Sequence, residues 1–516
     1  MKKLLILASF VAIVTGCNSY SGELVGVKGR EDWFQPDPYG MLYMPVGSYH
    51  MGPNDDEVGA AHTTKSKVVS IQAFYIDETE ISNNEYRQFV YWVRDSIARV
   101  LLANGGNAEA ADYQIPQEDY LDMYPVYRQD QNLKEFYINW EKKIKWDSND
   151  DDYRLDLQPL YLSEAERYYN RKEIDTRKLN YEWYRIDIRM AASKGNRFLP
   201  QKSPDVQVNE FKKGEYINGV TLNDGGTDKL GTLTAPVKDP GTEPKTLGEY
   251  QVEEETRDQN ISSTINYPSK TRKGVDRSVF IVKSITNVYP DTLAWVHDFT
   301  YAFNEPMTNM YFWHPAYDQY PVVGVSWKQA RAFCQWRSNL LNNFLISNGQ
   351  SIVNDFRLPT ESEWEYASRG GNDLSQYPWG GPYIRNARGC FLANFKPMRG
   401  SYEVDGGFHT VHIFSYNPND WGLYCMAGNA AEWTRNAFDE SAYDFEHDMN
   451  PDYEYEAQDN EANVLKRKVI RGGSWKDVGY YLQNSSKTYE YQDTAKCYIG
   501  FRCVMTYLGR AKDDNI

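Results

Sequence analysis

The sequence predicts a fold that combines helices with strands, and two kinds of local pattern predict it. MLYMPVGSYHMG from Met41 and VVSIQAFYID from Val68 alternate apolar and polar residues, as strands do, and we expect them to form two antiparallel strands. Helix starts are indicated where Ser or Thr precedes Glu or Gln by three residues, the spacing of a capping box. This spacing occurs at Ser82, Ser326 and Thr360.

The chain begins with the pattern of an export signal. Lys2 and Lys3 precede an apolar run from Leu4 to Val14, which is too short for a membrane-spanning helix of about 20 residues. The following VTGC is similar to a lipobox, so residues 1–16 are predicted to be a lipoprotein signal peptide and Cys17 to carry the lipid. A plain secretory signal that happens to end in Cys is the alternative.

The composition restricts the kinds of partner. The formal net charge of the 516 residues is -16, which argues against nucleic acid and anionic lipid headgroups as partners. The hydrophobic content of 41% is ample for a core. The 41 tyrosines suit extensive protein interfaces, because Tyr offers a large apolar area with a polar tip, and they are equally compatible with an aromatic-rich core.

The three predicted helices each have an expected apolar face. The helix after Ser82 should end at Gly105 and Gly106, and the helix after Thr360 should carry Trp364 and Tyr366 before RGG ends it. For the first helix the helical spacing selects Tyr86, Phe89, Val90, Val93, Ile97, Val100 and Leu101. For the helix after Ser326 it selects Trp327, Ala330, Phe333, Cys334, Leu340, Leu341 and Phe344.

The segment WGLYCMAGNAAEWT, residues 421–434, is the strongest candidate for a binding site. Gly422 and Gly428 permit backbone conformations that aim successive carbonyls at one point. Asn429 and Glu432 supply side-chain oxygens, and such a set of oxygens is what a hard cation such as Ca²⁺ selects. The alternative is an ordinary turn followed by the start of a short helix.

Several separated motifs resemble one enzyme family. They are DETEISNNEYRQFV from Asp77, PVVGVSWKQARAFCQWR from Pro321, FRLPTESEWEYASRGG from Phe356, VIRGGSW from Val469 and IGFRC from Ile499. In order and spacing they resemble the formylglycine-generating enzyme (sulfatase-modifying factor) domain. The resemblance implies an α+β, C-type-lectin-like fold with much irregular structure. It covers residues 38–103 and 295–508, and it leaves 17–37 as a tether, 104–294 as a long insertion and 509–516 as a tail.

The resemblance also implies two structural calcium centres. The first would use the side chains of Asn394 and Asp405, the carbonyl of Phe395, and the carbonyl of either Gly407 or Phe408. The sequence VDGGF has one Gly more than the family pattern, which leaves that last ligand open. The second centre would use the residues Gly428, Asn429, Ala430 and Glu432.

The resemblance further implies where catalytic cysteines would lie. Family members that oxidise a substrate cysteine carry two thiols shortly after a GGSF-like motif and bind Cu(I) there, since thiolate is the soft ligand that this ion prefers. This chain has no Cys between Cys425 and Cys497, and Asp477 and Leu482 stand about where the pair would be. We therefore expect no catalytic residues and no copper. The seven histidines are scattered, and no nucleophile-elbow motif offers another chemistry.

The first part of the mature chain narrows the resemblance. GELVGVKGREDWFQPDPYGM from Gly22 is similar to the GldK/PorK lipoproteins of gliding motility and type IX secretion. This implies a pseudoenzyme anchored by lipid to the periplasmic face of the outer membrane. It also implies self-association in a ring together with a GldN/PorN-type partner. An active oxidase of the same fold and a lectin-like binding module are the alternatives.

Five cysteines follow Cys17, so they cannot all pair within one chain. The resemblance implies a disulfide between Cys334 and Cys503, and two buried free thiols are the alternative. The other three, Cys390, Cys425 and Cys497, are expected to be mostly buried and free.

Overall fold

The computed structural model describes residues 34–54, 66–123, 136–188, 280–298, 306–397 and 407–509, with Ala192 and two short strands at 216–217 and 220–221. The unit that contains the candidate site is Pro38–Tyr507. Within the described ranges, no helix has the length and apolar character that crossing a membrane requires.

One four-stranded sheet joins the two ends of this unit. β4 (Phe74–Asp77) lies between β1 (Met41–Met44) and β16 (Val504–Thr506), and β11 (Phe356–Arg357) pairs with the other edge of β16. All of these pairings are antiparallel. The first and last strands of the fold are therefore both hydrogen-bonded to β4.

Each of the two alternating N-terminal stretches forms two short strands, so the prediction of one strand per stretch was wrong. β2 (Gly47–Met51) and β3 (Lys67–Ile71) pair antiparallel as a separate two-stranded sheet. Pro45 follows β1 directly, and because it has no backbone N–H it cannot continue the ladder. A Cβ on Gly47 would lie 2.3 Å from the hydroxyl oxygen of Tyr366, so the chain approaches the core closely where β2 begins.

The second four-stranded sheet carries the candidate site. Its order is β14–β13–β12–β15, in which β12 and β15 are parallel and the other pairs antiparallel. The strands are β12 (Ala431–Ala437), β13 (Arg467–Arg471), β14 (Lys487–Tyr491) and β15 (Ile499–Gly500). The segment after Gly428 is thus a buried strand and not the start of a short helix.

The three capping boxes are confirmed, because the long helices begin at the predicted caps. α2 (Asn83–Ala103), α9 (Trp327–Ser347) and α10 (Glu361–Arg369) each have both reciprocal hydrogen bonds of the box. α10 ends at Gly370, which has a positive φ of 57°. α2 ends one residue before Asn104, just short of the predicted glycines.

The predicted apolar face of α10 is correct, since Trp364 and Tyr366 are both buried, whereas those of α2 and α9 are correct near the N-terminus and wrong further along. In α2, Ala98 and Leu102 are buried where Ile97 and Leu101 were predicted, because a 3.6-residue repeat drifts around the helix. In α9, Leu340 and Phe344 are exposed. The C-terminal half of α9 therefore presents to solvent the apolar stripe that its sequence places on the core face.

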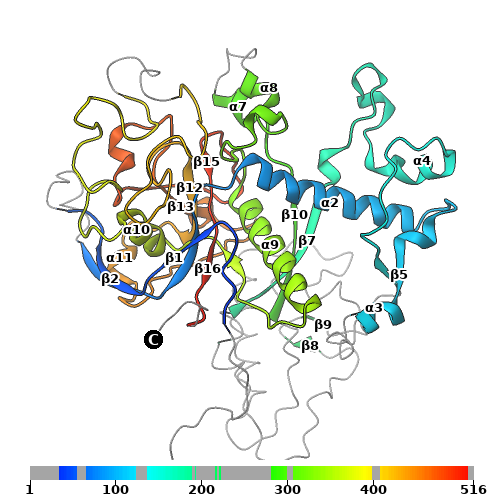
Figure 1. Ribbon diagram of the computed structural model, residues 1–516, viewed down its shortest axis with the longest axis horizontal. Coiled ribbons are helices and arrows are strands. Elements are labelled where there is room, and N and C mark those ends of the chain that lie inside the picture. The colour runs from blue at the N-terminus through cyan, green and yellow to red at the C-terminus, as the bar shows by residue number, and fades with distance from the viewer. Residues whose placement is uncertain are drawn as a thin grey trace, which may run out of the picture. The chain divides into compact units, whose positions relative to one another are not determined.

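The segment expected to be an insertion contributes regular structure. β7 (Asn180–Ile186) and β10 (Ile281–Asn287) form an antiparallel two-stranded sheet. Tyr181 and Trp183 on β7 are buried, and the Tyr181 ring lies 5.3 Å from that of Phe89 on α2. The other elements here are β5 (Gln114–Pro116), α3 (Gln117–Met123), β6 (Phe136–Ile138), α4 (Asp151–Leu157), β8 (Tyr216–Ile217) and β9 (Val220–Thr221). Figure 1 shows that α3, α4 and β5 lie beyond the far half of α2.

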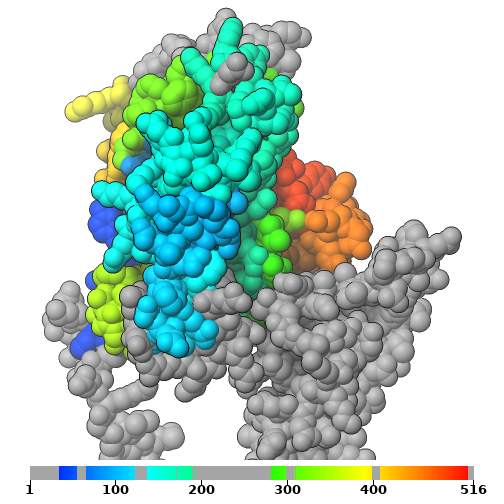
Figure 2. All heavy atoms as spheres, turned by 90° about the vertical axis from the view of Figure 1, so that its right-hand side faces the viewer, coloured from blue at the N-terminus to red at the C-terminus, as the bar shows by residue number. Residues whose placement is uncertain are grey.

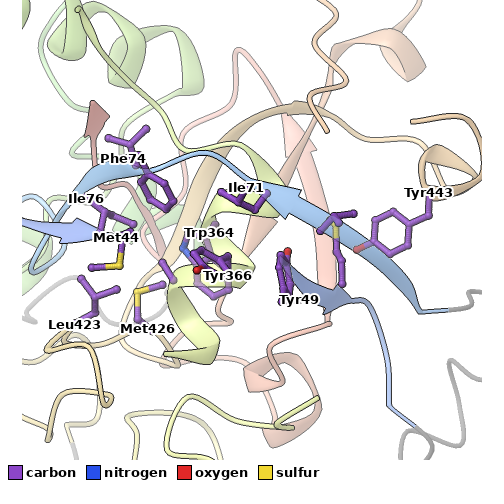
Figure 3. Close-up of a cluster of buried hydrophobic side chains, with 14 of the residues drawn as sticks. Met44, Tyr49, Ile71, Phe74, Ile76, Trp364, Tyr366, Leu423, Met426 and Tyr443 are labelled. Carbon is purple, nitrogen blue, oxygen red and sulfur yellow. The ribbon is translucent and has the colours of Figure 1, made fainter. Parts of the chain in front are cut away.

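Short helices complete the fold around the sheets: α7 (Ala294–Asp298), α8 (Pro306–Met310) and α11 (Ala442–Phe445). Trp364 of α10 lies at the centre of one hydrophobic cluster (Figure 3). The same cluster includes residues of β1, β3 and β4 as well as Leu423 and Met426 of the candidate segment. The core therefore reaches the segment 421–434 directly.

Candidate functional site

The candidate segment approaches β12 through a tight turn. Gly428 has a φ of 77°, and a Cβ there would lie 2.3 Å from the carbonyl oxygen of Asn394, so only glycine fits. Asn429 follows with a φ of 63°, and its backbone N–H donates to the same carbonyl at 2.9 Å. The structure thus brings the two predicted oxygen loops together, as one hydrogen-bonded pair of turns.

Glu432 extends from β12 into the core, and both of its carboxylate oxygens accept hydrogen bonds from other side chains. Arg502 donates to Glu432 from Nη2 to Oε1 at 2.6 Å and from Nε to Oε2 at 2.7 Å. The indole of Trp364 donates to Oε2 at 2.7 Å. Glu432 and Arg502 are almost completely buried. A bidentate pair of this kind is a strong, charge-assisted contact that fixes both side chains.

Glu80 is a site residue that the sequence analysis missed. It is fully buried, and its carboxylate accepts hydrogen bonds from Asn429 Nδ2 at 2.7 Å and from the backbone N–H of Ala430 at 2.9 Å. Burial, and then the charge of Glu432, raise the pKa of Glu80 to about 8. The positive charge of Arg502 acts in the opposite direction and lowers the pKa of Glu80, so the charges of Glu80, Glu432 and Arg502 influence one another.

The predicted second calcium centre does not fit a cation in this arrangement. Both oxygens of Glu432 accept hydrogen bonds, and a cation beside them would lie against the charge of Arg502. The side-chain oxygen of Asn429 is the other side-chain ligand predicted for this centre. It accepts a hydrogen bond from the backbone N–H of Val411 at 2.8 Å. Throughout the described ranges, no three His, Cys, Asp or Glu side chains form a group suited to a metal ion.

The predicted first calcium centre is only partly within the described residues. Asn394 is buried, and its Nδ2 donates to the carbonyl of His409 at 2.7 Å, which turns the amide oxygen to the opposite side. Gly407 and the half-exposed Phe408 are described, whereas Asp405 lies outside the described residues. The atoms predicted to bind the cation at this centre are all oxygens, which are the ligands that Ca²⁺ prefers.

The loop after RGGSW is closed by contacts that need no thiol. Leu482 is buried in a cluster with Phe395 and Tyr377. Asp477 accepts hydrogen bonds from the backbone N–H of Ser474 at 2.9 Å and from its hydroxyl at 2.6 Å. Burial raises the pKa of Asp477. An apolar side chain and a carboxylate bonded to its own loop therefore occupy the two positions that the resemblance assigns to the thiol pair.

The cysteines that were expected to pair are neighbours but are not bonded. Cys334 Sγ and Cys503 Sγ lie 3.5 Å apart, and both are free thiols in the structure. Cys425 and Cys497 are buried and Cys390 is half-buried, and none of the three forms a disulfide in the structure. Cys17, the predicted lipid attachment site, lies outside the described residues.

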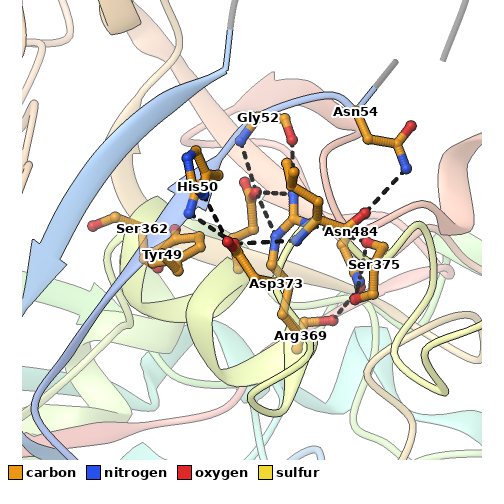
Figure 4. Close-up of polar contacts among 12 residues, drawn as sticks. Tyr49, His50, Gly52, Asn54, Ser362, Arg369, Asp373, Ser375 and Asn484 are labelled. Atoms are coloured by element: carbon orange, nitrogen blue, oxygen red, sulfur yellow. Dashed lines mark hydrogen bonds and ion pairs between the residues drawn. The ribbon is translucent and has the colours of Figure 1, made fainter. Parts of the chain in front are cut away.

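A polar network fixes the opposite side of α10 (Figure 4). Arg369 pairs with Glu365 at 2.7 Å and donates to the carbonyl of Gly52 at 2.7 Å. Asp373, just after the helix, lies 2.6 Å from Nδ1 of His50 on β2. These contacts attach the β2–β3 sheet to the helix that carries Trp364.

Comparison with known proteins decides the family. The sulfatase-modifying factor enzyme 1-like domain (FGE-sulfatase) matches residues 32–199 and 212–507. The chain belongs to this family. The FGE-like mixed helix and strand fold follows from the membership. The match also extends over most of residues 104–294, which the motifs alone had left as an insertion.

Individual relatives include both active and inactive members by name. The chain is 33% identical over 192 residues to "Inactive C-alpha-formylglycine-generating enzyme 2" of Bos taurus, covering 36% of this chain and 50% of the relative. It is 30% identical over 197 residues to the formylglycine-generating enzyme of Bos taurus, covering 37% of this chain and 45% of the relative. The chain thus spans about half the length of these curated relatives.

Among solved structures, the chain is similar to PvdO from Pseudomonas aeruginosa. The identity is 13% and the TM-score 0.36, with 90% of this chain and 94% of PvdO covered.

Proposed function

We propose that this chain is a non-catalytic structural lipoprotein, and that it uses the FGE-like fold as a scaffold. The observation that carries the proposal is the loop after RGGSW, where Leu482 is packed in a hydrophobic cluster and Asp477 is bonded to Ser474. Neither side chain can bind Cu(I) or exchange a disulfide, because both reactions need a thiolate. The relatives named inactive indicate that the family includes such members.

The proposed setting is the type IX secretion and gliding-motility machinery. The chain would be held by a lipid on Cys17 at the periplasmic face of the outer membrane and would assemble with a GldN/PorN-type partner into a ring. The VTGC signal and the N-terminal resemblance support this setting. Calcium at the centre of Asn394, Phe395 and Asp405 is proposed as a structural ion that orders its loop.

Extraction of native membranes in mild detergent tests this proposal. Pull-down of the tagged full chain should recover a complex much larger than the 59.8 kDa of one chain, containing the GldN/PorN-type partner. The variant Cys17→Ser should leave the membrane fraction and lose the complex. The matched variant Cys390→Ser, which changes a thiol of the folded domain, should retain both. Recovery of the wild type as a soluble single chain would contradict the proposal.

A further inference from the structure

Residues 158–178 form a hairpin-like projection with an ordered tip. Tyr161 and Ile174 form an antiparallel bridge, and the N–H of Asp175 donates to the carbonyl of Leu160 at 2.9 Å. Leu160 is buried, so the projection is attached to the core at its base. Residues 163–172 make up the tip.

Polar contacts hold the tip in one conformation. Arg177 pairs with Asp175 at 2.8 Å and reaches Glu166 in the tip at 3.0 Å. Arg167 Nε donates to the carbonyl of Leu162 at 2.8 Å. The pair of Arg177 with Glu166 joins the two sides of the projection, and the other two contacts stabilise each side locally. The tip is therefore organised before any partner binds, which lowers the entropy cost of binding.

The tip presents its aromatic side chains to solvent instead of burying them. Tyr168 is 77% exposed and Tyr169 is 91% exposed, and the backbone of Tyr169 has a φ of 50°, a conformation that bulky residues rarely adopt. Arg171 and Lys172 are exposed beside them. Tyr and Arg are the residues most often found at the energetic centre of protein interfaces. We call these four residues the tip patch.

A second exposed surface, on α4, has the complementary composition. The side chain of Asp151 is 95% exposed and lies 3.4 Å from Arg154 of the same helix, Asp152 is exposed, and Leu155 is 64% exposed. Residues three and four apart share one side of a helix, so Leu155 lies between the two carboxylates on a single α4 face. Figure 2 views the molecule from the side on which this part of the chain, drawn in cyan, forms much of the surface.

We propose that the tip patch of one copy of this chain docks on the α4 face of a second copy. Aromatic rings flanked by two cations would meet a leucine flanked by two carboxylates, so apolar and charged groups match simultaneously. The net charge of -16 disfavours an anionic membrane as the occupant. A contact made once between two copies is head-to-tail and closes into a ring or extends as a filament, whereas a reciprocal contact stops at a dimer. This deepens the proposed scaffold role, on which it rests.

Sedimentation velocity of the purified full chain in mild detergent tests the contact without any partner protein. The wild type should self-associate as concentration rises and dissociate as salt is added, since exposed charges are screened. Arg171→Glu with Lys172→Glu should abolish the association, and so should Asp151→Lys with Asp152→Lys. An equal mixture of these two charge-reversed proteins should restore association between unlike copies, because the reversed tip patch of one also complements the reversed α4 face of the other.

Two controls keep the test decisive. Arg388→Glu with Glu440→Lys reverses exposed charges elsewhere and should associate like the wild type. Tyr168→Ser with Tyr169→Asn should weaken association without changing charge, and Asn tolerates the backbone conformation of position 169.

A monomeric wild type at every concentration would overturn the contact. Association of the charge-reversed variants to the same extent as the wild type would also overturn it. Binding of the tip patch to phosphatidylserine vesicles in place of a second copy would do the same. None of these results decides whether the native complex is recovered from membranes, so the pull-down tests the scaffold role separately.

Discussion

Arg502 and Glu432 form a buried bidentate ion pair that links the C-terminal motif IGFRC to strand β12. The variant Glu432→Gln keeps the shape but leaves the guanidinium buried without its counter-charge. Breaking one partner of a buried pair costs about 3–5 kcal/mol, so we expect a loss of that size in the free energy of unfolding. Urea denaturation followed by fluorescence measures it.

The matched control for this prediction is a surface pair. Asp459, which is exposed, pairs with Lys328 at 2.9 Å. Asp459→Asn should change the free energy of unfolding by at most about 1 kcal/mol, because water screens the charges. Equal effects of the two variants would contradict the role given to the buried pair.

Chelation distinguishes the two predicted calcium centres. If the ion binds only around Asn394, EGTA should lower the melting temperature of the wild type and of Glu432→Gln by the same amount. Differential scanning fluorimetry with and without EGTA makes the comparison. A chelator effect that disappears in Glu432→Gln would place an ion at Glu432, against the geometry of its pair with Arg502.

The cap of α9 predicts a smaller and local effect. Ser326→Ala removes the side-chain oxygen that accepts from the N–H of Gln329. We expect the free energy of unfolding to fall by about 1 kcal/mol. Ser347→Ala, at the exposed end of the same helix, is the control and should be close to neutral. A larger loss from the control would show that the cap is not what starts this helix.

Glu446 predicts a pH dependence of stability. Burial, followed by the charge of Glu361, raises its pKa from 4.5 to about 7. The folded state holds this proton more tightly than the unfolded state, so its contribution is complete below pH 4.5 and is lost as pH rises through 7. Glu446→Gln should therefore gain about 1 kcal/mol over the wild type at pH 8 and nothing at pH 4, because partial exposure screens the charge.

Denaturation curves at the two pH values test the Glu446 prediction. Glu440→Gln, at an exposed position, should show no such difference between pH 4 and pH 8. A gain for Glu446→Gln that is the same at both values would mean that packing, not protonation, explains it.

The neighbouring thiols predict a redox-dependent link. Cys334 Sγ and Cys503 Sγ lie 3.5 Å apart, whereas a disulfide bond holds two sulfurs at about 2.05 Å. In an oxidising compartment the bond would close a loop of about 170 residues and stabilise the fold by roughly 4–5 kcal/mol in the entropy model. Mass spectrometry of unreduced peptides from exported protein should find the 334–503 linkage. Recovery of both residues alkylated without reduction would contradict it.

The sequence predicted the parts of this fold that depend on neighbouring residues. The three capping boxes are local, since a side chain and a backbone N–H three residues apart define each one. The pairing of β4 with β16 was not predictable, because these two strands are over 400 residues apart and no local pattern encodes a partner. The drift of the buried face along α2 likewise depends on what the helix packs against.

The candidate site was also predicted only in part. Gly428 was identified from its backbone freedom and Asn429 from its side-chain oxygen, and both have a positive φ in the structure. The ion pair between Glu432 and Arg502 was not predicted, although both residues lie in motifs that the sequence analysis recognised. Glu80 was overlooked because it precedes the Ser82 cap and its motif was taken as the start of a helix. Only the distance between Glu80 and Asn429 reveals its place.

The most direct test of the central claim is an assay for cysteine oxidation. Purified full chain would be loaded with Cu(I), dialysed, and incubated aerobically with a thiol reductant and a cysteine-containing sulfatase peptide, beside an active formylglycine-generating enzyme. Mass spectrometry of the peptide measures conversion of cysteine to formylglycine. With Asp477 and Leu482 in place of the thiols, we predict no conversion and no retained copper. Catalytic conversion by this chain, dependent on retained copper, would contradict the account.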